Sequence, residues 1–361
     1  MLSYYCMVLL GLYSSVLCAM EDKKCQLDFC PTRSEYYRQK AANNQNPNKI
    51  CFFCDKESLK SNYIISEDVP GDVRVMMNKT PYPDFDQAIH LLIMPMSHKE
   101  LPSDFSHKEL TEQSGALQWL STQLHATAYT QEYFTNWGKM AGQTVPHWHS
   151  HVKSYTMPPF SMPQRMKYFK NPVIKNIEEA FENTKKLLES PMVEQQLLEA
   201  QHNENKCLCC LLQKGQMGSD EENFVVARFT HNYVCLAHYS FCAGEIAIIP
   251  NRHVASIKDL LQGELTENMA LAMALLPKMS SYAHEKIRDC DGGNVYTKSM
   301  GAKASVEQQM NYHVHTLIMP RTTITPIPGA MDGNSCKLDY NPDHLFAYLK
   351  EKIDEIKDML T

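Results

Sequence analysis

The chain has 361 residues, of which 43% are hydrophobic and 21% are charged, and its formal net charge is −6 at pH 7. This length suits one to three domains with a substantial core, and the composition excludes a collagen and a fully disordered chain. The mildly acidic balance gives no support to a broad nucleic-acid-binding surface. The unusual counts are 13 cysteines and 15 histidines, which call for a test of metal binding.

The N-terminal segment has two interpretations. An apolar run at residues 6–19 is too short to span a membrane comfortably, and a charged stretch follows it. Residues 1–19 are therefore a signal peptide or lie upstream of a true start at Met20. We expect a polar arm over residues 20–47. Because the cysteines show no disulfide framework, we predict a cytoplasmic protein, with secretion as the alternative if residues 1–19 are a signal peptide.

The chain presents the same features twice in the same order, and this repetition decides the fold prediction. Residues 48–156 hold a Cys-x-x-Cys pair, an apolar strand followed by a histidine, a helix that opens with Glu-Leu-Thr-Glu, and a histidine-rich strand. Residues 204–325 hold the same features at nearly the same spacing. The sequence therefore predicts a tandem duplication of an α+β domain.

The periodicity of apolar residues places the other elements. Strands are expected at residues 73–77 and 88–94. Helices are expected at residues 111–128, 177–188, 266–287 and 343–360. The second of these helices belongs to a linker at residues 157–203, and the last belongs to a C-terminal segment at residues 326–361.

Each half also supplies a set of metal ligands. Two thiolates at Cys-x-x-Cys spacing can bind one ion, because the turn between them points both sulfurs the same way, and zinc takes four ligands. Each half adds two histidines at matched places. We predict two structural Zn²⁺ sites without an open position for water, formed by Cys51, Cys54, His98 and His147 and by Cys207, Cys210, His253 and His313. A buried or redox-active thiol pair is the alternative for one such motif, and Cys209 is a competing ligand.

The segment from Asn136 to His151 indicates phosphate chemistry. Residues two apart on a strand face the same way, so His147, His149 and His151 share one face. The glycines before them let backbone N–H groups approach an anion. A neutral imidazole in the middle of such a row is a good nucleophile toward phosphorus, and neighbouring donors stabilise the phosphate charge. The alternative is a histidine row that faces solvent or only binds metal.

These residues resemble a known superfamily. The run from Gly142 to His151 resembles the signature of the histidine triad (HIT-like) superfamily. The longer string from Asn136 to His149, with Asn-Lys-Thr-Pro at residues 78–81, resembles the galactose-1-phosphate uridylyltransferases and the dinucleoside tetraphosphate phosphorylases. The resemblance covers most of residues 48–322. It implies two tandem HIT-like domains, each an antiparallel sheet with a long helix, that form a pseudo-dimer.

The resemblance also implies roles for single residues. His149 would attack the α-phosphorus of a nucleotide and form a nucleotidyl-histidine intermediate. His147 would be both a zinc ligand and the first triad histidine. His151 would contact phosphate or assist protonation of the leaving group, and it departs from the uridylyltransferases, which have glutamine there. The substrate-binding residues would be Asn136, Gly142, Gln143 and Thr144 at the phosphate oxygens and Phe52, Phe53 and Asn78 at the base and ribose.

The second half departs from the pattern. Leu317 stands where a third histidine is expected, and the loop at residues 301–309 lacks the Gly-Gln-Thr run, although His315 keeps the position of the nucleophile. We predict that this half is a metal-stabilised partner that has lost activity and completes the sheet, and the alternative is that it is active. The first half would then be the catalytic one.

The sequence thus predicts a nucleotidyl transferase or hydrolase that acts at the α-phosphate of a nucleotide substrate through His149. Water, phosphate or a sugar phosphate would be the acceptor. The alternative is a non-catalytic HIT-like module that binds a nucleotide or a protein. A triad enzyme acting on nucleic-acid ends is a third option, but no basic arm is evident. We expect no nucleic-acid or membrane partner. The chain is expected to be a monomer, in which the two halves form the pseudo-dimer, or a homodimer.

Overall fold

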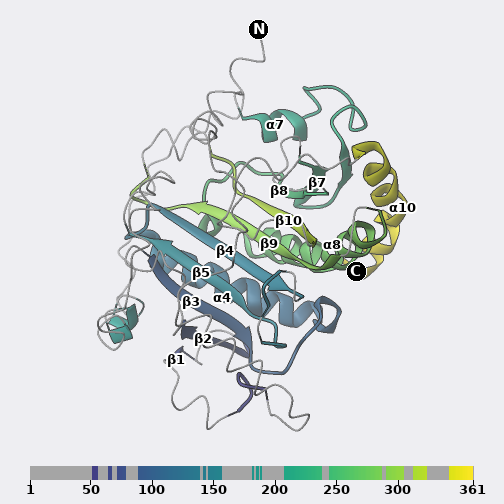
Figure 1. The fold of residues 1–361 in the computed structure, drawn as a ribbon. Coiled ribbons are helices and arrows are strands. Elements are labelled where there is room, and N and C mark those ends of the chain that lie inside the picture. The colour runs from purple at the N-terminus through teal and green to yellow at the C-terminus, as the bar shows by residue number, and fades with distance from the viewer. Residues whose placement is uncertain are drawn as a thin grey trace, which may run out of the picture.

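A computed structural model gives the fold (Figure 1). It describes residues 51–55, 64–66, 71–78, 88–138, 141–143, 145–156, 207–237, 244–286, 290–304, 312–322 and 341–360, with single residues between 181 and 188. The segment at 1–19, the predicted arm at 20–47 and the linker at 157–203, apart from single residues between 181 and 188, lie outside the described residues.

The described strands form one antiparallel sheet in the order β1-β2-β3-β5-β4-β9-β10-β8-β7-β6. The first half contributes β1 (Ile64–Ser66), β2 (Val73–Met77), β3 (Ala88–Pro95), β4 (Thr130–Trp137) and β5 (Ser150–Tyr155). The second half contributes β6 (Val225–Arg228), β7 (Asn232–Leu236), β8 (Ile246–Pro250), β9 (Cys290–Met300) and β10 (His315–Thr322). Read from each outer edge inward, both halves have the same strand order. The predicted pseudo-dimer of α+β domains is therefore confirmed.

The halves join where β4 pairs with β9, from Thr130 opposite Met300 to Trp137 opposite Gly293. Gly292 makes this close approach feasible, because a Cβ at that position would overlap the Trp137 carbonyl oxygen. Gly292 also has a φ of +93°, a conformation that other residues adopt at a cost. This seam, at the centre of the sheet, is where residues of the second half come nearest to the first.

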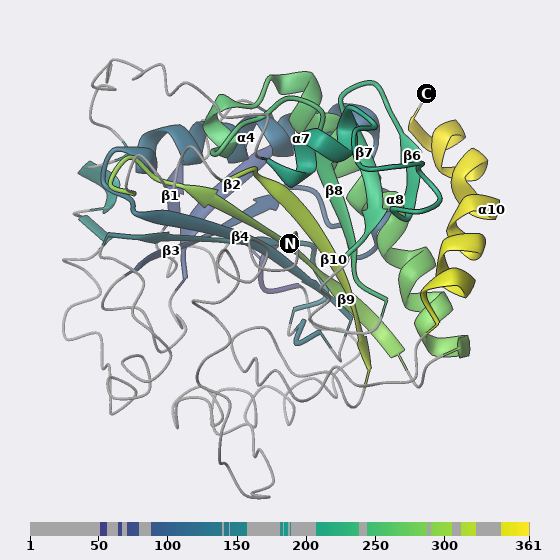
Figure 2. The ribbon, with the colours of Figure 1, turned by 90° about the horizontal axis from the view of Figure 1, so that it is seen from above.

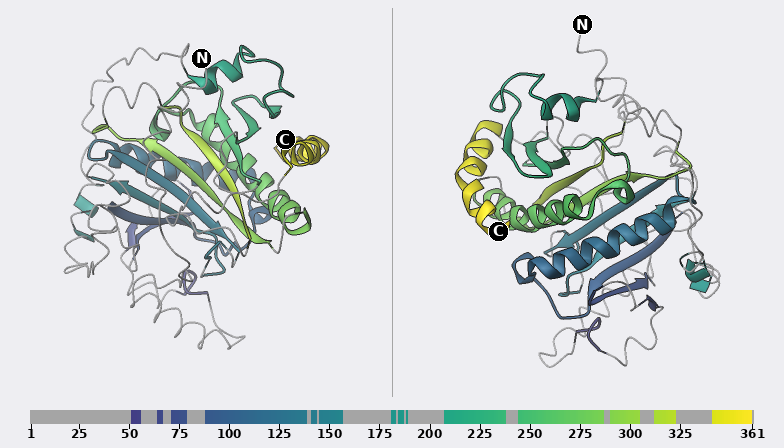
Figure 3. Two further views of the ribbon diagram at one scale, coloured as in Figure 1. Left: turned by 45° about the horizontal axis from the view of Figure 1, so that its top comes forward. Right: turned by 180° about the vertical axis from the view of Figure 1, so that it is seen from behind.

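Two long helices, α4 (His107–His125) and α8 (Gln262–Lys286), cover the same face of the sheet (Figures 2 and 3). Each begins about four residues before its predicted start, because the first turn is polar and adds nothing to the apolar periodicity. In α4, the Ser106 hydroxyl accepts a hydrogen bond from the Glu109 N–H and the Glu109 carboxylate accepts one from the Ser106 N–H. This reciprocal capping fixes the helix start.

The core lies between the helices and the sheet. In the first half, Val75, Leu91 and Val152 of the strands pack with Leu120 and Leu124 of α4. The C-terminal helix α10 (Pro342–Leu360) packs against α8 and β6 at the outer edge of the second half, as Figure 2 shows. Its inward residues recur at helical spacing, as predicted: Leu345, Leu349, Ile353 and Ile356. None of the described helices is long and apolar enough to cross a membrane.

Candidate active site and metal centres

The first cysteine pair lies in a tight turn, in which the Cys54 and Asp55 N–H groups both donate to the Cys51 carbonyl. His98, after β3, and His147, before β5, complete a cluster with Cys51 and Cys54, and its four donor atoms lie within 4.8 Å of one another. His147 Nδ1 lies 3.5 and 3.4 Å from the two sulfurs. Tetrahedral zinc would separate a sulfur and a nitrogen ligand by about 3.5 Å. The predicted ligands are therefore brought together at a suitable spacing.

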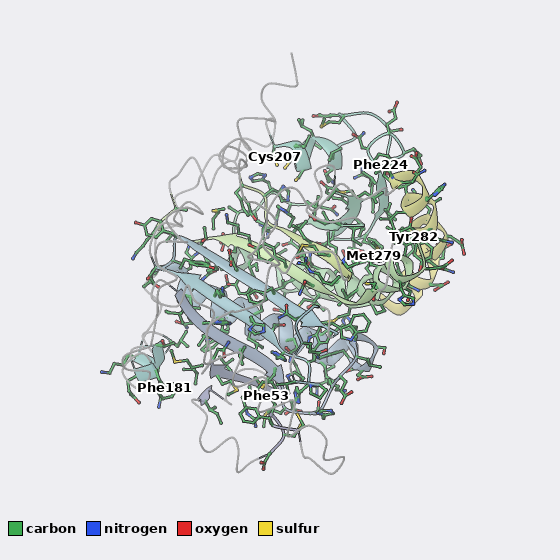
Figure 4. The ribbon with its side chains drawn as sticks, viewed as in Figure 1. Phe53, Phe181, Cys207, Phe224, Met279 and Tyr282 are labelled. Atoms are coloured by element: carbon green, nitrogen blue, oxygen red, sulfur yellow. The ribbon has the colours of Figure 1, made fainter. Side chains whose placement is uncertain are left out.

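The second cluster repeats this arrangement with Cys207, Cys210, His253 and His313. Cys207 precedes the short helix α7 (Leu208–Gln213) and Cys210 lies within it. The sulfur-to-Nδ1 distances are 3.2–3.6 Å. Cys209 is not one of the four donors, but its thiol hydrogen-bonds to Cys207 and lowers the pKa of that thiol. Figure 4 shows Phe53, which lies between the first two cysteines, and Cys207 at opposite ends of the molecule.

Hydrogen bonds fix which histidine nitrogen faces the sulfurs. His147 Nε2 donates to the Pro95 carbonyl at 3.0 Å, and His313 Nε2 donates to the Pro250 carbonyl at 3.0 Å. Because a carbonyl only accepts, the proton is on Nε2 and the Nδ1 lone pair points to the sulfurs. Burial lowers the pKa of His147 to about 4, which keeps the ring neutral. Both clusters thus have the donor chemistry and orientation of a site that could hold a metal ion.

A hydrogen bond to a backbone carbonyl also orients His149. Its Nδ1–H donates to the His147 carbonyl at 2.7 Å, so in the neutral form of the ring the lone pair is on Nε2. The edge of the Phe53 ring supports both His147 and His149, with ring centroids 5.6 and 5.3 Å away. Trp148 points to the opposite side and is 1% exposed, as expected for a core residue. The arrangement presents a neutral imidazole ready to act as a nucleophile.

His151 makes a contact that the sequence did not predict. Its ring stacks on Phe134 at 4.6 Å, and its Nδ1 lies 3.0 Å from Nε2 of the buried His90. Asn78, predicted at the ribose, approaches the same nitrogen of His90, with its Nδ2 3.3 Å from His90 Nε2. One signal could have found His90: the two apolar runs that end in proline are each directly preceded by a buried polar residue, His90 in the first half and Glu245 in the second.

The glycine loop before the triad connects β4 to β5. Gly138 and Gly142 both have a φ of +83°, and the Gln143 side-chain oxygen accepts a hydrogen bond from the Gly138 N–H at 2.9 Å. The oxygen of Gln143 therefore closes the loop, while its nitrogen keeps two N–H donors. Continuing the pairing of Thr135 with Ser150 by one residue sets Asn136 opposite His149. Thr144 lies outside the described residues.

The second half keeps the orientation of the nucleophile but not the loop. His315 Nδ1 donates to the His313 carbonyl at 2.9 Å, as His149 does to His147. However, the N–H groups of Gly301, Ala302 and Lys303 donate to carbonyls of Tyr129, His125 and Ala128 in the first half. These donors are already used and cannot surround a phosphate.

Comparisons with known proteins agree with this architecture. Residues 73–155 match the model of the HIT domain family. A GalT-like protein from Arabidopsis thaliana is 18% identical with a TM-score of 0.54, covering 84% of this chain and 92% of its own. ADP-glucose phosphorylase from Arabidopsis thaliana, solved with bound ADP-glucose, is 17% identical with a TM-score of 0.54, covering 86% and 93%.

A uridylyltransferase of known structure is 16% identical with a TM-score of 0.55, covering 94% of this chain and 95% of that one. A sequence search of curated proteins finds no significant match. At such identities the structural likeness establishes the fold. Residues 73–155 thus match the HIT domain family, and the chain as a whole has a duplicated fold similar to that of the GalT-like protein.

Proposed function

We propose that this chain transfers a nucleoside monophosphate from a nucleotide substrate to an acceptor through His149. The observation that carries this proposal is the 2.7 Å hydrogen bond from His149 Nδ1 to the His147 carbonyl. It holds the ring in the tautomer whose Nε2 can attack phosphorus. The alternative, a non-catalytic binding module, gives no reason for this orientation to coincide with an intact glycine loop.

In the first step, His149 Nε2 attacks the α-phosphorus. A P–N bond forms as the bond from phosphorus to the leaving oxygen breaks, and the electron pair of the broken bond goes to that oxygen. His151 lies next along the strand face, with ring centroids 5.1 Å apart, and would contact phosphate or protonate the leaving oxygen. In the second step an acceptor oxygen attacks phosphorus, the P–N bond breaks, and His149 is restored.

The donors around His149 would stabilise the phosphate charge. These donors come from one stretch of the chain. Asn136 lies just before the loop, and the loop itself contributes the Gly142 N–H, the Gln143 side-chain nitrogen and Thr144. Such fixed donors contribute most where charge develops in the transition state. Phe53 is buried beneath the histidines, whereas Phe52, whose ring lies 5.5 Å from that of Phe53, is only partly buried. Phe52 is therefore our choice for stacking on the base.

A nucleoside diphosphate sugar is the substrate class that we test first, because a protein of similar fold was solved with ADP-glucose. Inorganic phosphate, a sugar phosphate or water would be the acceptor. The base is left to the experiment, since none of the described contacts selects one.

We further propose that both cysteine–histidine clusters hold structural Zn²⁺. Each cluster offers four protein ligands, so a bound ion would supply rigidity rather than an activated water. The residue that links metal and chemistry is His147, because its ring belongs to the cluster and its carbonyl holds His149. Native mass spectrometry of the whole chain tests the metal content directly, with two zinc ions per chain as the expected result.

Covalent trapping tests the reaction. The purified chain is incubated with nucleotides or nucleotide sugars that carry label at the α-phosphate, quenched in base and examined for phosphohistidine that is lost in acid. We expect label on the wild type and none on His149→Asn. The matched control is His315→Asn, at the equivalent position of the second half, which should keep the label. Label that survives His149→Asn, or none with any nucleotide, contradicts the proposal, and unlabelled binding would favour the binding module.

A further inference from the structure

Two buried asparagines meet where the halves join. Asn136 of β4 and Asn294 of β9 are direct partners in the antiparallel pair, and they are 7% and 0% exposed. The Asn294 side-chain nitrogen donates to the Asn136 side-chain oxygen at 2.6 Å. The same nitrogen lies 3.4 Å from the Ala141 carbonyl in the glycine loop. A residue of the second half is thus bonded to the predicted phosphate site of the first.

Arg321 of β10 decides which way this amide points. It is 3% exposed, and its Nε donates to the Asn294 side-chain oxygen. A guanidinium group only donates hydrogen bonds, so it must face the oxygen of Asn294 and not the nitrogen. Consequently the Asn294 nitrogen faces Asn136, and Asn136 must accept with its oxygen. The three side chains therefore form a chain of hydrogen bonds with one direction.

This direction matters because Asn136 and His149 each lie one residue beyond the last pair of β4 and β5, Thr135 with Ser150, and an extension of that register sets them opposite each other. With its oxygen held by Asn294, the Asn136 amide has its nitrogen left to donate, as an anionic phosphate requires. If the amide were turned over, an oxygen would face the phosphate oxygens and repel them. The close approach of β9 to β4 that allows the contact depends on Gly292, two residues before Asn294.

We propose that Arg321 and Asn294 are positioning residues that fix the Asn136 amide so that it donates to the α-phosphate of a nucleotide at His149. This inference rests on the proposed function and adds a role for the second half. The N–H groups at residues 301–303 of its own loop are already bonded to the first half, yet it supplies two of the three side chains that set the donor in the first half. Neither Asn294 nor Arg321 touches the reacting atoms.

The test compares two variants of the same position. Asn294→Asp keeps the shape and the partner of Arg321 but only accepts, so it forces Asn136 to turn its nitrogen away from the phosphate. Asn294→Ala removes the contact, so the Asn136 amide can adopt either orientation. We expect the rate of His149 labelling to fall about 100-fold in Asn294→Asp and about 10-fold in Asn294→Ala, with a smaller change in KM than in kcat.

A structural role alone gives the opposite order, because alanine leaves a cavity and a buried arginine without its acceptor. Asn268→Asp is the matched control: Asn268 is another buried asparagine of the second half, bonded to Asn232 and Thr316. Thermal unfolding of each variant shows whether it folds. An Asn294→Asp chain that labels like the wild type, or faster than Asn294→Ala, overturns the inference. An unlabelled wild type overturns the proposed function itself.

Discussion

Three glycines with a positive φ occupy three different surroundings, and replacing each with alanine separates strain, function and packing. Gly215 and Gly142 have φ values of +66° and +83°, and a Cβ at either position meets nothing within 4 Å. Gly292 has a φ of +93°, and its Cβ would overlap the Trp137 carbonyl and lie 2.8 Å from the Gly138 Cα. The distance to the Gly138 Cα is about 1 Å shorter than a normal carbon–carbon contact.

The expected free energies follow from these surroundings. Gly215→Ala and Gly142→Ala carry only the backbone strain, so each should lower the free energy of unfolding by about 1 kcal/mol. Gly292→Ala adds an overlap that only a shift of β9 away from β4 relieves. Overpacking of this kind costs about 1–3 kcal/mol, and we therefore expect a total loss of about 3 kcal/mol.

The three variants should rank differently in His149 labelling than in stability. Gly142→Ala places a methyl group in the open space beside the loop that we assign to phosphate, so His149 labelling should fall about 100-fold, while the free energy of unfolding falls no further than it does in Gly215→Ala. Gly292→Ala should lose both stability and labelling, because the seam carries the contact between Asn294 and Asn136. Gly215→Ala should label normally.

Urea unfolding in the presence of zinc and single-turnover labelling are the two assays. If Gly292→Ala were as stable as Gly215→Ala, the inference that β9 and β4 pack closely at residue 292 would be wrong. If Gly142→Ala labelled normally, the glycine loop would not be the phosphate site.

Further perturbations address the metal sites, His90 and pH. Cys54→Ser should lower the zinc count by one in native mass spectrometry and slow labelling, whereas Cys210→Ser, in the fully buried cluster, should mainly lower the unfolding midpoint. His90→Phe removes the 3.0 Å partner of His151 and should slow labelling about 10-fold at an unchanged zinc count. Burial opposes ionisation of Glu109, but the Ser106 N–H and Lys99 prevail and lower its pKa to about 2. Its stabilisation is therefore complete above its ordinary pKa and lost as the pH falls through about 2, a dependence that an acid titration of Glu109→Gln should lack.

Much of the fold was accessible from the sequence because the chain repeats itself. The two Cys-x-x-Cys pairs and the matched histidines predicted both clusters, since ligand spacing is visible in a single sequence. His149 could be chosen because alternation along a predicted strand places it on one face with His151, and their rings do lie 5.1 Å apart although β5 begins only at Ser150. The helix starts were less accessible, since the cap at Ser106 and Glu109 is polar and leaves no apolar period.

The parts that could not be predicted depend on contacts between elements distant in the chain. Asn294 meets Asn136 only because β4 and β9 pair in a particular register, which no local pattern specifies. Arg321 is one further strand away. Likewise, the missing Gly-Gln-Thr run showed that the second loop is degenerate, but only the structure shows that its N–H groups bind carbonyls of the first half.

This use of the second loop predicts that restoring the third histidine will not restore a second active site. Leu317→His in a His149→Asn background completes the triad pattern next to His315, which already has the orientation of a nucleophile. The N–H groups of the loop at residues 301–303 nevertheless remain bonded to the first half. We therefore expect no label on His315.

We also expect a loss of about 2 kcal/mol in the free energy of unfolding, because Leu317 packs with Tyr233 and Met319 in an apolar cluster. Leu317→Met, which keeps the apolar packing, is the control for stability. Label on His315 in the double variant would mean that the triad alone is sufficient and that the loop donors are dispensable. Its absence would show that this half lost its chemistry through the backbone of its loop, whose donors now brace the connection that leads into β4.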